Sequence, residues 1–220
     1  MKLPKRKFNK IWIIVPVIIL LCIFLMFFLK KDNKEEKMGN TITSQTKEEI
    51  EEYILNIDSY EAMLSIEVTS NKNQNKYKIK QSFQSPNICV QEVLEPSNIQ
   101  GLKTIYDGTN LSLQNTRLHL STVYENYPYL TENNLWLTSF VEEYKKTQDA
   151  LCEDSNTQWI LSIPKNAMGI QKKLAVDKKT GKPIHLEVQD RNRNTSVYIV
   201  YNEIEINNLK GKNILAFQQN

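Results

Sequence analysis

The sequence predicts an α+β protein in which an antiparallel sheet follows a single N-terminal transmembrane helix. Three observations lead to this fold class. An uncharged apolar run covers residues 11–29. From Tyr60 onward, apolar and polar residues alternate over many short segments, which is the period of strands that bury one face. Two stretches, 46–57 and 131–147, instead repeat their apolar residues at the spacing of amphipathic helices.

The apolar run, IWIIVPVIILLCIFLMFFL, is nineteen residues long, which is enough for a helix to cross the hydrocarbon core of a bilayer. Five basic residues and no acid precede it, so the positive-inside rule places residues 1–10 in the cytoplasm. We therefore expect a single-pass protein of the cell membrane whose C-terminal domain is extracytoplasmic. The anchor residues expected within the membrane include Ile11, Trp12, Leu20, Cys22, Phe28 and Leu29.

The same run has the apolar character of two other kinds of segment. A cleaved signal peptide has a shorter apolar core, of about 7 to 15 residues, and a small-residue cleavage site. The run is longer, and no such site follows it. A lipoprotein would need small residues before Cys22, where Ile19, Leu20 and Leu21 stand. An uncleaved anchor with Cys22 inside the span is therefore the favoured interpretation.

Charge separates the anchor from the rest of the chain. Residues 1–31 hold seven of the 28 Lys and Arg residues and none of the 25 acids, so the remainder carries 21 basic against 25 acidic residues, a net charge of −4. A nucleic-acid role, which needs a basic face on the domain itself, is not supported. Residues 30–45 form a polar linker, and residues 46–220 suffice for one extracytoplasmic domain.

The domain is predicted to open with a short helix and a long strand. Thr46 and Glu49 form a capping box, in which each side chain satisfies a free backbone amide at the helix start. A strand then begins near Tyr60, and a polar tip at 70–75 leads into a second strand ending near Phe83. The candidate concave apolar face is made of residues that share one side of the first strand: Tyr60, Leu64, Ile66 and Val68.

Further strands follow in an antiparallel meander. They are expected at 88–94, 102–106 and 110–113, with a sixth marked by Leu118 and Leu120. Asp107-Gly108 predicts a hairpin, because glycine accepts the positive φ of a tight turn. A helix at 131–147 should lie across the sheet. The remaining strands are expected at 157–163, 171–176, 184–189 and 196–206, with Asp177–Pro183 as a turn and a tail from Leu209 in which Phe217 is docked or free.

The sequence contains no motif of a catalytic, metal or cofactor site, and its six glycines all fit turns or loops. His119 and His185 each fall in a predicted strand, where a structural or surface role is expected. Cys89 and Cys152 are expected to be buried thiols, and a disulfide between them remains open because spacing does not decide it. We therefore expect a binding protein and not an enzyme, with no cofactor and no metal.

Several segments together resemble a known superfamily. The order of IYDGTNLSL, TQWILSIP, AVDKKTGKPIHLEV and VYIVYNEIEIN resembles the LolA/LolB-like lipoprotein carriers. The segments NIDSYEAMLSIEVTSNKNQNKYKIKQSF and EVLEPSNIQGLKTIYDG are similar to the GerS germination lipoproteins of spore-forming clostridia, and the match spans residues 46–208. The resemblance implies a strongly curved antiparallel sheet, an unclosed β-barrel with helices covering its concave face. One departure is the uncleaved span, since the GerS branch is lipid-anchored.

The resemblance also implies a function. In the GerS branch the domain binds and supports, without catalysis, the amidase that makes the muramic lactam of spore cortex. We expect a membrane-anchored envelope protein with such a partner in sporulation or germination, binding through a sheet edge or the concave face. A homodimer by strand exchange fits the same edge. The alternatives are a carrier of acyl lipid or lipoprotein on the concave apolar face, and an extracytoplasmic sensor or anti-sigma-type regulator.

Overall fold

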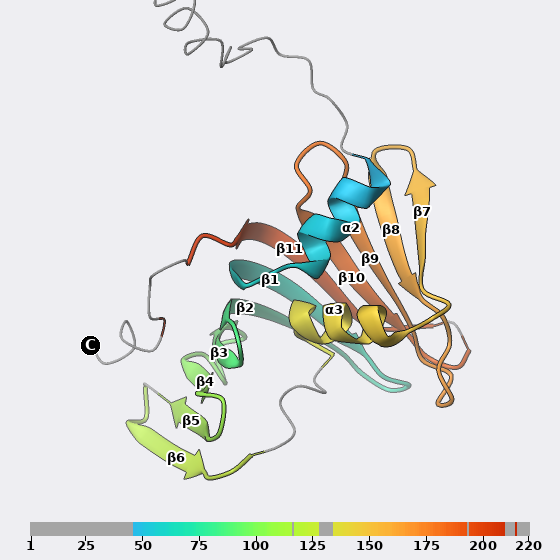
Figure 1. The fold of residues 1–220 in the computed structure, drawn as a ribbon. Coiled ribbons are helices and arrows are strands. Elements are labelled where there is room, and N and C mark those ends of the chain that lie inside the picture. The colour runs from blue at the N-terminus through green and yellow to red at the C-terminus, as the bar shows by residue number, and fades with distance from the viewer. Residues whose placement is uncertain (1–45, 116, 128–133, 193, 210–213, 215–220) are drawn as a thin grey trace, which may run out of the picture. The chain divides into compact units, whose positions relative to one another are not determined.

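The structure, a computed structural model, describes residues 46–115, 117–127, 134–192, 194–209 and 214 (Figure 1). The predicted cytoplasmic tail, anchor and linker at 1–45 lie outside the described residues, and so does Phe217. Within the described ranges, no helix combines the length and the apolar character that crossing a bilayer requires. The predictions for the anchor and its orientation therefore stay predictions.

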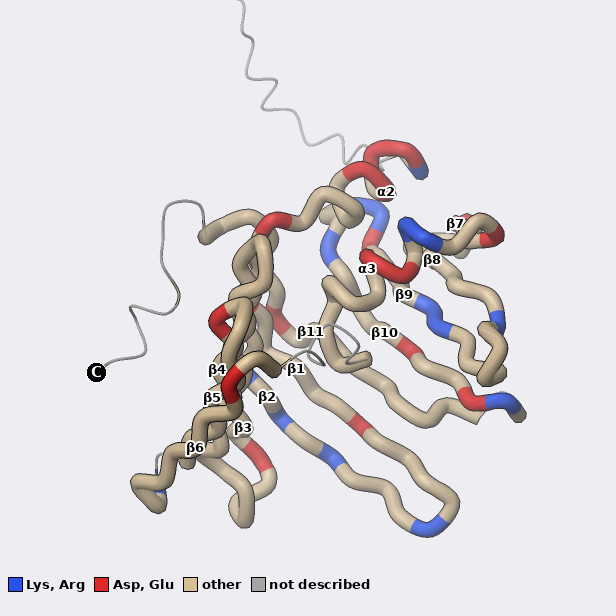
Figure 2. Tube along the Cα trace, turned by 60° about the horizontal axis from the view of Figure 1, so that its bottom comes forward, with Lys and Arg blue, Asp and Glu red and all other residues tan. Residues whose placement is uncertain are grey.

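The described part of the chain forms one eleven-stranded antiparallel sheet. The strands are β1 (Ser59–Thr69), β2 (Gln74–Gln84), β3 (Ile88–Glu95), β4 (Leu102–Tyr106), β5 (Leu111–Asn115), β6 (Leu120–Tyr124), β7 (Leu151–Ser155), β8 (Gln158–Ile163), β9 (Gln171–Asp177), β10 (Pro183–Gln189) and β11 (Thr195–Ile206). Their spatial order is β6-β5-β4-β3-β2-β1-β11-β10-β9-β8-β7. The sheet is strongly curved, and its edge strands β6 and β7 do not meet, so the predicted unclosed sheet is confirmed (Figures 1 and 2).

The centre of the sheet is the pairing of the first strand with the last. Tyr60 on β1 lies opposite Ile206 on β11 and opposite Phe83 on β2. A register shift at Met63/Leu64 keeps apolar side chains on one face on both sides of the irregularity, because side-chain direction alternates along a strand. The strand pattern predicted from Tyr60 onward is therefore confirmed.

Two helices lie on the concave face of the sheet (Figure 1). Helix α2 (Lys47–Leu55) begins with the predicted capping box, in which Thr46 and Glu49 hydrogen-bond each other's backbone amides. Helix α3 (Leu137–Lys146) connects the two edge strands and contacts both α2 and β8, so it crosses the sheet as predicted. It begins at Leu137, later than the predicted start near 131, because the residues before it that the structure describes form a turn.

The core fills the space between the helices and the concave face. Its members on the helices are Ile50, Ile54, Leu137, Phe140, Val141 and Tyr144, and Trp136 just before α3 joins them. A smaller apolar cluster lies on the opposite face of the sheet, where Leu209 and Ile214 pack against Val90. The C-terminal segment predicted as a tail is thus anchored at two positions.

Three local predictions were wrong. Strand β7 was not predicted, because LCEDS at an exposed edge lacks the alternation of a half-buried strand. The sixth strand begins at Leu120, and Leu118 lies in the preceding turn, where Asn115 Oδ1 accepts hydrogen bonds from the backbone. His119 lies in that turn with φ 52°, and not in a strand. His185 does lie in a strand, β10.

Candidate functional site

A cleft of about 830 Å³ opens between the C-terminal end of α2, helix α3 and strands β2–β4. Its floor is apolar and comes from the core: Phe83, Cys89, Tyr106, Trp136 and Val141 line it. Its rim is polar and carries both signs of charge, with Asp58, Glu142, Lys145 and Lys146 among the lining residues. An apolar floor with a few polar groups around it is typical of binding sites.

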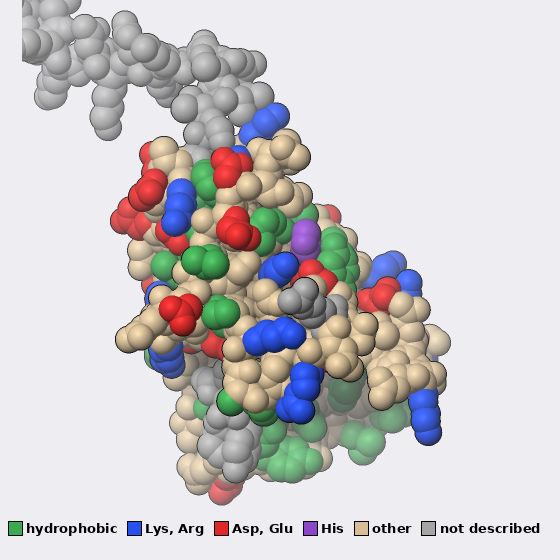
Figure 3. Space-filling view, turned by 90° about the vertical axis from the view of Figure 1, so that its right-hand side faces the viewer, with side chains coloured by type: hydrophobic (Ala, Val, Ile, Leu, Met, Phe, Trp, Pro, Cys, Tyr) green, Lys and Arg blue, Asp and Glu red, His purple; other side chains and the backbone are tan. Residues whose placement is uncertain are grey.

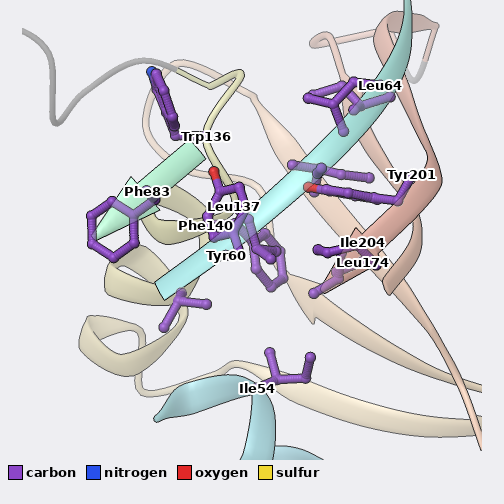
Figure 4. Packing of buried hydrophobic residues seen from close by; sticks show 14 of the residues in the cluster. Ile54, Tyr60, Leu64, Phe83, Trp136, Leu137, Phe140, Leu174, Tyr201 and Ile204 are labelled. Atoms are coloured by element: carbon purple, nitrogen blue, oxygen red, sulfur yellow. The ribbon is translucent and has the colours of Figure 1, made fainter. Parts of the chain in front are cut away.

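Trp136 supplies an unpaired hydrogen-bond donor at this site. It is the residue that precedes α3, and only 2% of its surface is exposed. Its indole Nε1 is buried and has no hydrogen-bond partner (Figure 4 shows the nitrogen at the end of the ring that lies away from Phe83). A buried donor without an acceptor costs about 1–3 kcal/mol, so native proteins rarely leave one unpaired without a reason. Trp136 lines the cleft, but its N–H is covered in the free chain, so an acceptor oxygen reaches it only when neighbouring side chains move.

A buried polar network fixes the segment that carries Trp136. The amide of Gln81 on β2 is fully buried, and its Nε2 lies 3.3 Å from the carbonyl oxygen of Leu135 and 3.3 Å from Oε1 of Gln91. Its Oε1 accepts a hydrogen bond of 2.7 Å from the hydroxyl of Tyr60. Burial raises the pKa of Tyr60 well above its ordinary value, so the hydroxyl remains a donor. The network holds the start of α3 against the sheet.

The sequence-predicted apolar face lies beneath the helices. Tyr60, Leu64 and Ile66 are buried in the main core cluster, and Val68 is half-buried at its margin. The described lining of the cleft contains none of the four. Their role as a ligand-binding face stays a prediction. Phe83 falls at the end of the predicted second strand and Trp136 within the predicted 131–147 helix, whereas Gln81 was missed because a polar residue in a strand usually faces solvent.

The cysteines and acidic residues provide little reactive chemistry. Cys89 and Cys152 are free thiols, the first buried and the second half-buried. Burial raises the pKa of Cys89 to about 12 and that of Cys152 to about 11, so both stay protonated at neutral pH. Within the described ranges, no cluster of three or more His, Cys, Asp or Glu side chains is placed to hold a metal ion.

Comparison with known proteins adds similarities of structure. No family model and no curated protein matches the chain. An uncharacterized conserved protein of Thermus thermophilus is 12% identical, with a TM-score of 0.49 over 75% of this chain and 90% of that one. A chain of the Clostridioides difficile CwlD amidase–GerS lipoprotein complex is 21% identical, with a TM-score of 0.46 over 73% and 96%. A LolA superfamily protein of Nitrosomonas europaea is 11% identical, with a TM-score of 0.38 over 74% and 94%.

Proposed function

We propose that the chain is a non-enzymatic protein of the cell envelope that binds a partner protein through the cleft between α2, α3 and β2–β4. The observation that carries this proposal is an amphipathic cleft lined by Trp136, whose indole N–H is buried and unpaired in the free chain. An apolar group of the partner covers Phe83 and Tyr106, and a shift of the side chains around Trp136 lets a partner oxygen accept the indole hydrogen bond. The charged rim then meets polar groups of the partner.

The packing of the core favours a protein partner over bound acyl chains. Tyr60, Leu64 and Ile66 are each at most 2% exposed beneath the helices. An acyl chain would reach them only by displacing α2 or α3, with the loss of the contacts that those helices make. A protein that inserts one or two side chains into the cleft needs no such displacement.

The identity of the partner is proposed from the sequence resemblance. The GerS-like segments suggest a cell-wall amidase that modifies the spore cortex, and the N-terminal apolar run suggests that the domain meets it outside the cytoplasm while anchored to the membrane. The protein's role is then to hold and support the enzyme during sporulation or germination.

A second candidate function, carriage of an acyl lipid or lipoprotein, is favoured by one observation. The cleft volume of about 830 Å³ lies within the range of small-molecule sites, about 300–1,000 Å³. Lys145 and Lys146 at the rim have the charge that pairs with an acidic head group.

The experiment is a crosslinking pull-down of the tagged full chain from sporulating cells, comparing the wild type with Trp136→Phe. The substitution removes the N–H and keeps an aromatic ring at the floor. We expect it to lower recovery of a cell-wall amidase about tenfold, the effect of losing about 1.4 kcal/mol. Trp159→Phe is the matched control, since Trp159 lies on β8 and does not line the cleft.

The outcome separates the two candidates. Equal recovery by the wild type and Trp136→Phe would remove the cleft as the partner site. If no amidase is recovered and mass spectrometry instead detects acyl lipid bound to the wild type, with less lipid on Trp136→Phe, lipid carriage replaces partner binding as the proposed function.

A further inference from the structure

The edge strand β6 is uncharged and exposed along its whole length. Its five residues read LSTVY, and no strand in the described part of the chain pairs with its outer side. Large apolar side chains gather here: Leu118 is 64% exposed, Leu120 62%, Val123 57% and Tyr124 46%. They are four of the seven exposed large hydrophobic residues in the described ranges. An exposed apolar edge with free backbone groups is a template for strand pairing.

The opposite edge, β7, has the features that prevent such pairing. Glu153 and Asp154 lie in the middle of the strand, and Asp154 forms an ion pair with Lys178 of the turn after β9. The Lys178 ammonium also donates to the carbonyl oxygen of Asn156 and lies 4.6 Å from the ring centroid of Trp159. Figure 2 shows β6 without charged residues, and Figure 3 shows acidic and basic side chains on the side of the molecule where β7 lies. Charged edges resist the addition of another strand.

The sequence of β6 is complementary to itself in an antiparallel pair. When two copies meet about a two-fold axis at Thr122, the two Thr122 residues lie opposite each other. Leu120 of each copy then faces Tyr124 of the other on one face, and Ser121 faces Val123 on the other face. No charged residue meets a like charge anywhere along the pair.

We infer that β6 pairs with β6 of a second copy of this chain, so that the sheet continues across a two-fold dimer interface. Pairing of β6 with β7 of another copy is disfavoured, because it sets Glu153 and Asp154 against an apolar strand. The two-fold arrangement uses the β6 edge of each copy and therefore closes at two copies, whereas a β6–β7 contact gives a ring or an open filament. This surface is separate from the partner cleft, and the inference does not depend on the function proposed for that cleft.

Disulfide trapping in intact cells tests the inference with the full chain. The background carries Cys22→Ser and Cys152→Ser, while buried Cys89 is kept. Thr122→Cys places two thiols opposite each other, at a Cα separation of about 5 Å that a disulfide spans. Two controls share the background. In Ser121→Cys the two residues 121 of the dimer are offset by two positions along the strands, so their Cα atoms lie about 8 Å apart. Glu153→Cys places the thiol at the centre of β7.

After oxidation, we expect Thr122→Cys to give about tenfold more covalent dimer than either control, because only its geometry matches a disulfide. Adding Val123→Glu, at a position where the exposed side chain contributes little to folding, should reduce that yield by placing a carboxylate in the interface. Dimer yields that are equal for Thr122→Cys and Glu153→Cys would overturn the inference, as would a yield that Val123→Glu leaves unchanged.

Discussion

At the scale of single residues, a buried ion pair joins α3 to the sheet. The Lys172 ammonium on β9, 7% exposed as a residue, meets the carboxylate of Glu143 on α3. Glu143→Ala leaves this charge buried without a partner. We expect a loss of about 2 kcal/mol in the free energy of unfolding, less than for a fully buried pair because the Glu143 side chain keeps 32% exposure. Urea unfolding of a fragment from Met38 to Asn220 measures the change.

The neighbouring residue provides the control. Glu142 pairs with Lys146 at 3.5 Å on the exposed side of the same helix. Because exposed pairs contribute little, Glu142→Ala should change the free energy of unfolding by less than about 0.5 kcal/mol. Equal losses of free energy of unfolding in Glu143→Ala and Glu142→Ala would show that burial of Lys172 does not increase the contribution of its ion pair to stability.

Sequence periodicity predicted which residues are buried better than which polar groups bind each other. The alternation after Tyr60 indicated the buried face because it depends only on neighbours in the chain. Gln81 contacts Leu135, 54 residues away, and the side chain of Asn207 accepts hydrogen bonds from the amides of Asp58 and Ser59. Asn207 also adopts a positive φ of 57°. Such roles depend on the tertiary fold, so no local pattern could have indicated the polar half of the candidate site.

At the scale of elements, the predicted β4–β5 hairpin owes its turn to Asp107. Its Oδ1 accepts hydrogen bonds from the backbone amides of Asn110 at 2.7 Å and Thr109 at 2.9 Å, and these bonds lower the pKa of the carboxyl. Because the pKa is lower in the folded state, the ionised carboxylate stabilises the folded state at every pH above the ordinary Asp pKa of about 3.9. This contribution disappears as the pH falls through the lowered pKa of the folded state. We expect Asp107→Asn to be less stable than the wild type at pH 7, with the difference shrinking below about pH 4.

Unfolding curves of the same fragment between pH 7 and pH 2 measure this difference. Asp149→Asn makes the same change of charge at an exposed position before β7. It should not reproduce the pH-dependent difference. If Asp107→Asn and the wild type differ in free energy of unfolding by the same amount from pH 7 to pH 2, the ionised Asp107 carboxylate does not stabilise the turn.

The strand and helix boundaries show where local patterns stop being informative. The turns at Asp107-Gly108 and Asp177–Pro183 were predicted, because each is stabilised by hydrogen bonds among its own residues. Strand β7 was not predicted, because its two-residue turn to β8 places Asn156 at φ 46° without a glycine. It pairs with β8, which follows it, and Cys152 is its one side chain that packs against the main core.

At the scale of the whole molecule, ten of the eleven strands could be predicted but their order in the sheet could not. The central pairing of β1 with β11 joins segments at opposite ends of the domain, and α3 connects the two edges. This order leaves two faces to be covered. The helices cover the concave face, and residues Leu209 and Ile214 cover Val90 on the other, with Ile88 and Ile105 at the margin.

Coverage of the second face predicts that the C-terminal segment is a structural element. Ile214 is 3% exposed, and its amide donates to Oε1 of Gln84 at 3.4 Å. Ile214→Ala leaves a cavity against Val90, and we expect a loss of about 2 kcal/mol in the free energy of unfolding, the low end for a buried isoleucine. Leu118→Ala, which shortens an exposed side chain, should lose less than about 0.5 kcal/mol. If both variants unfold at the wild-type urea concentration, the segment does not stabilise the sheet, and its contact with Val90 contributes nothing to the fold.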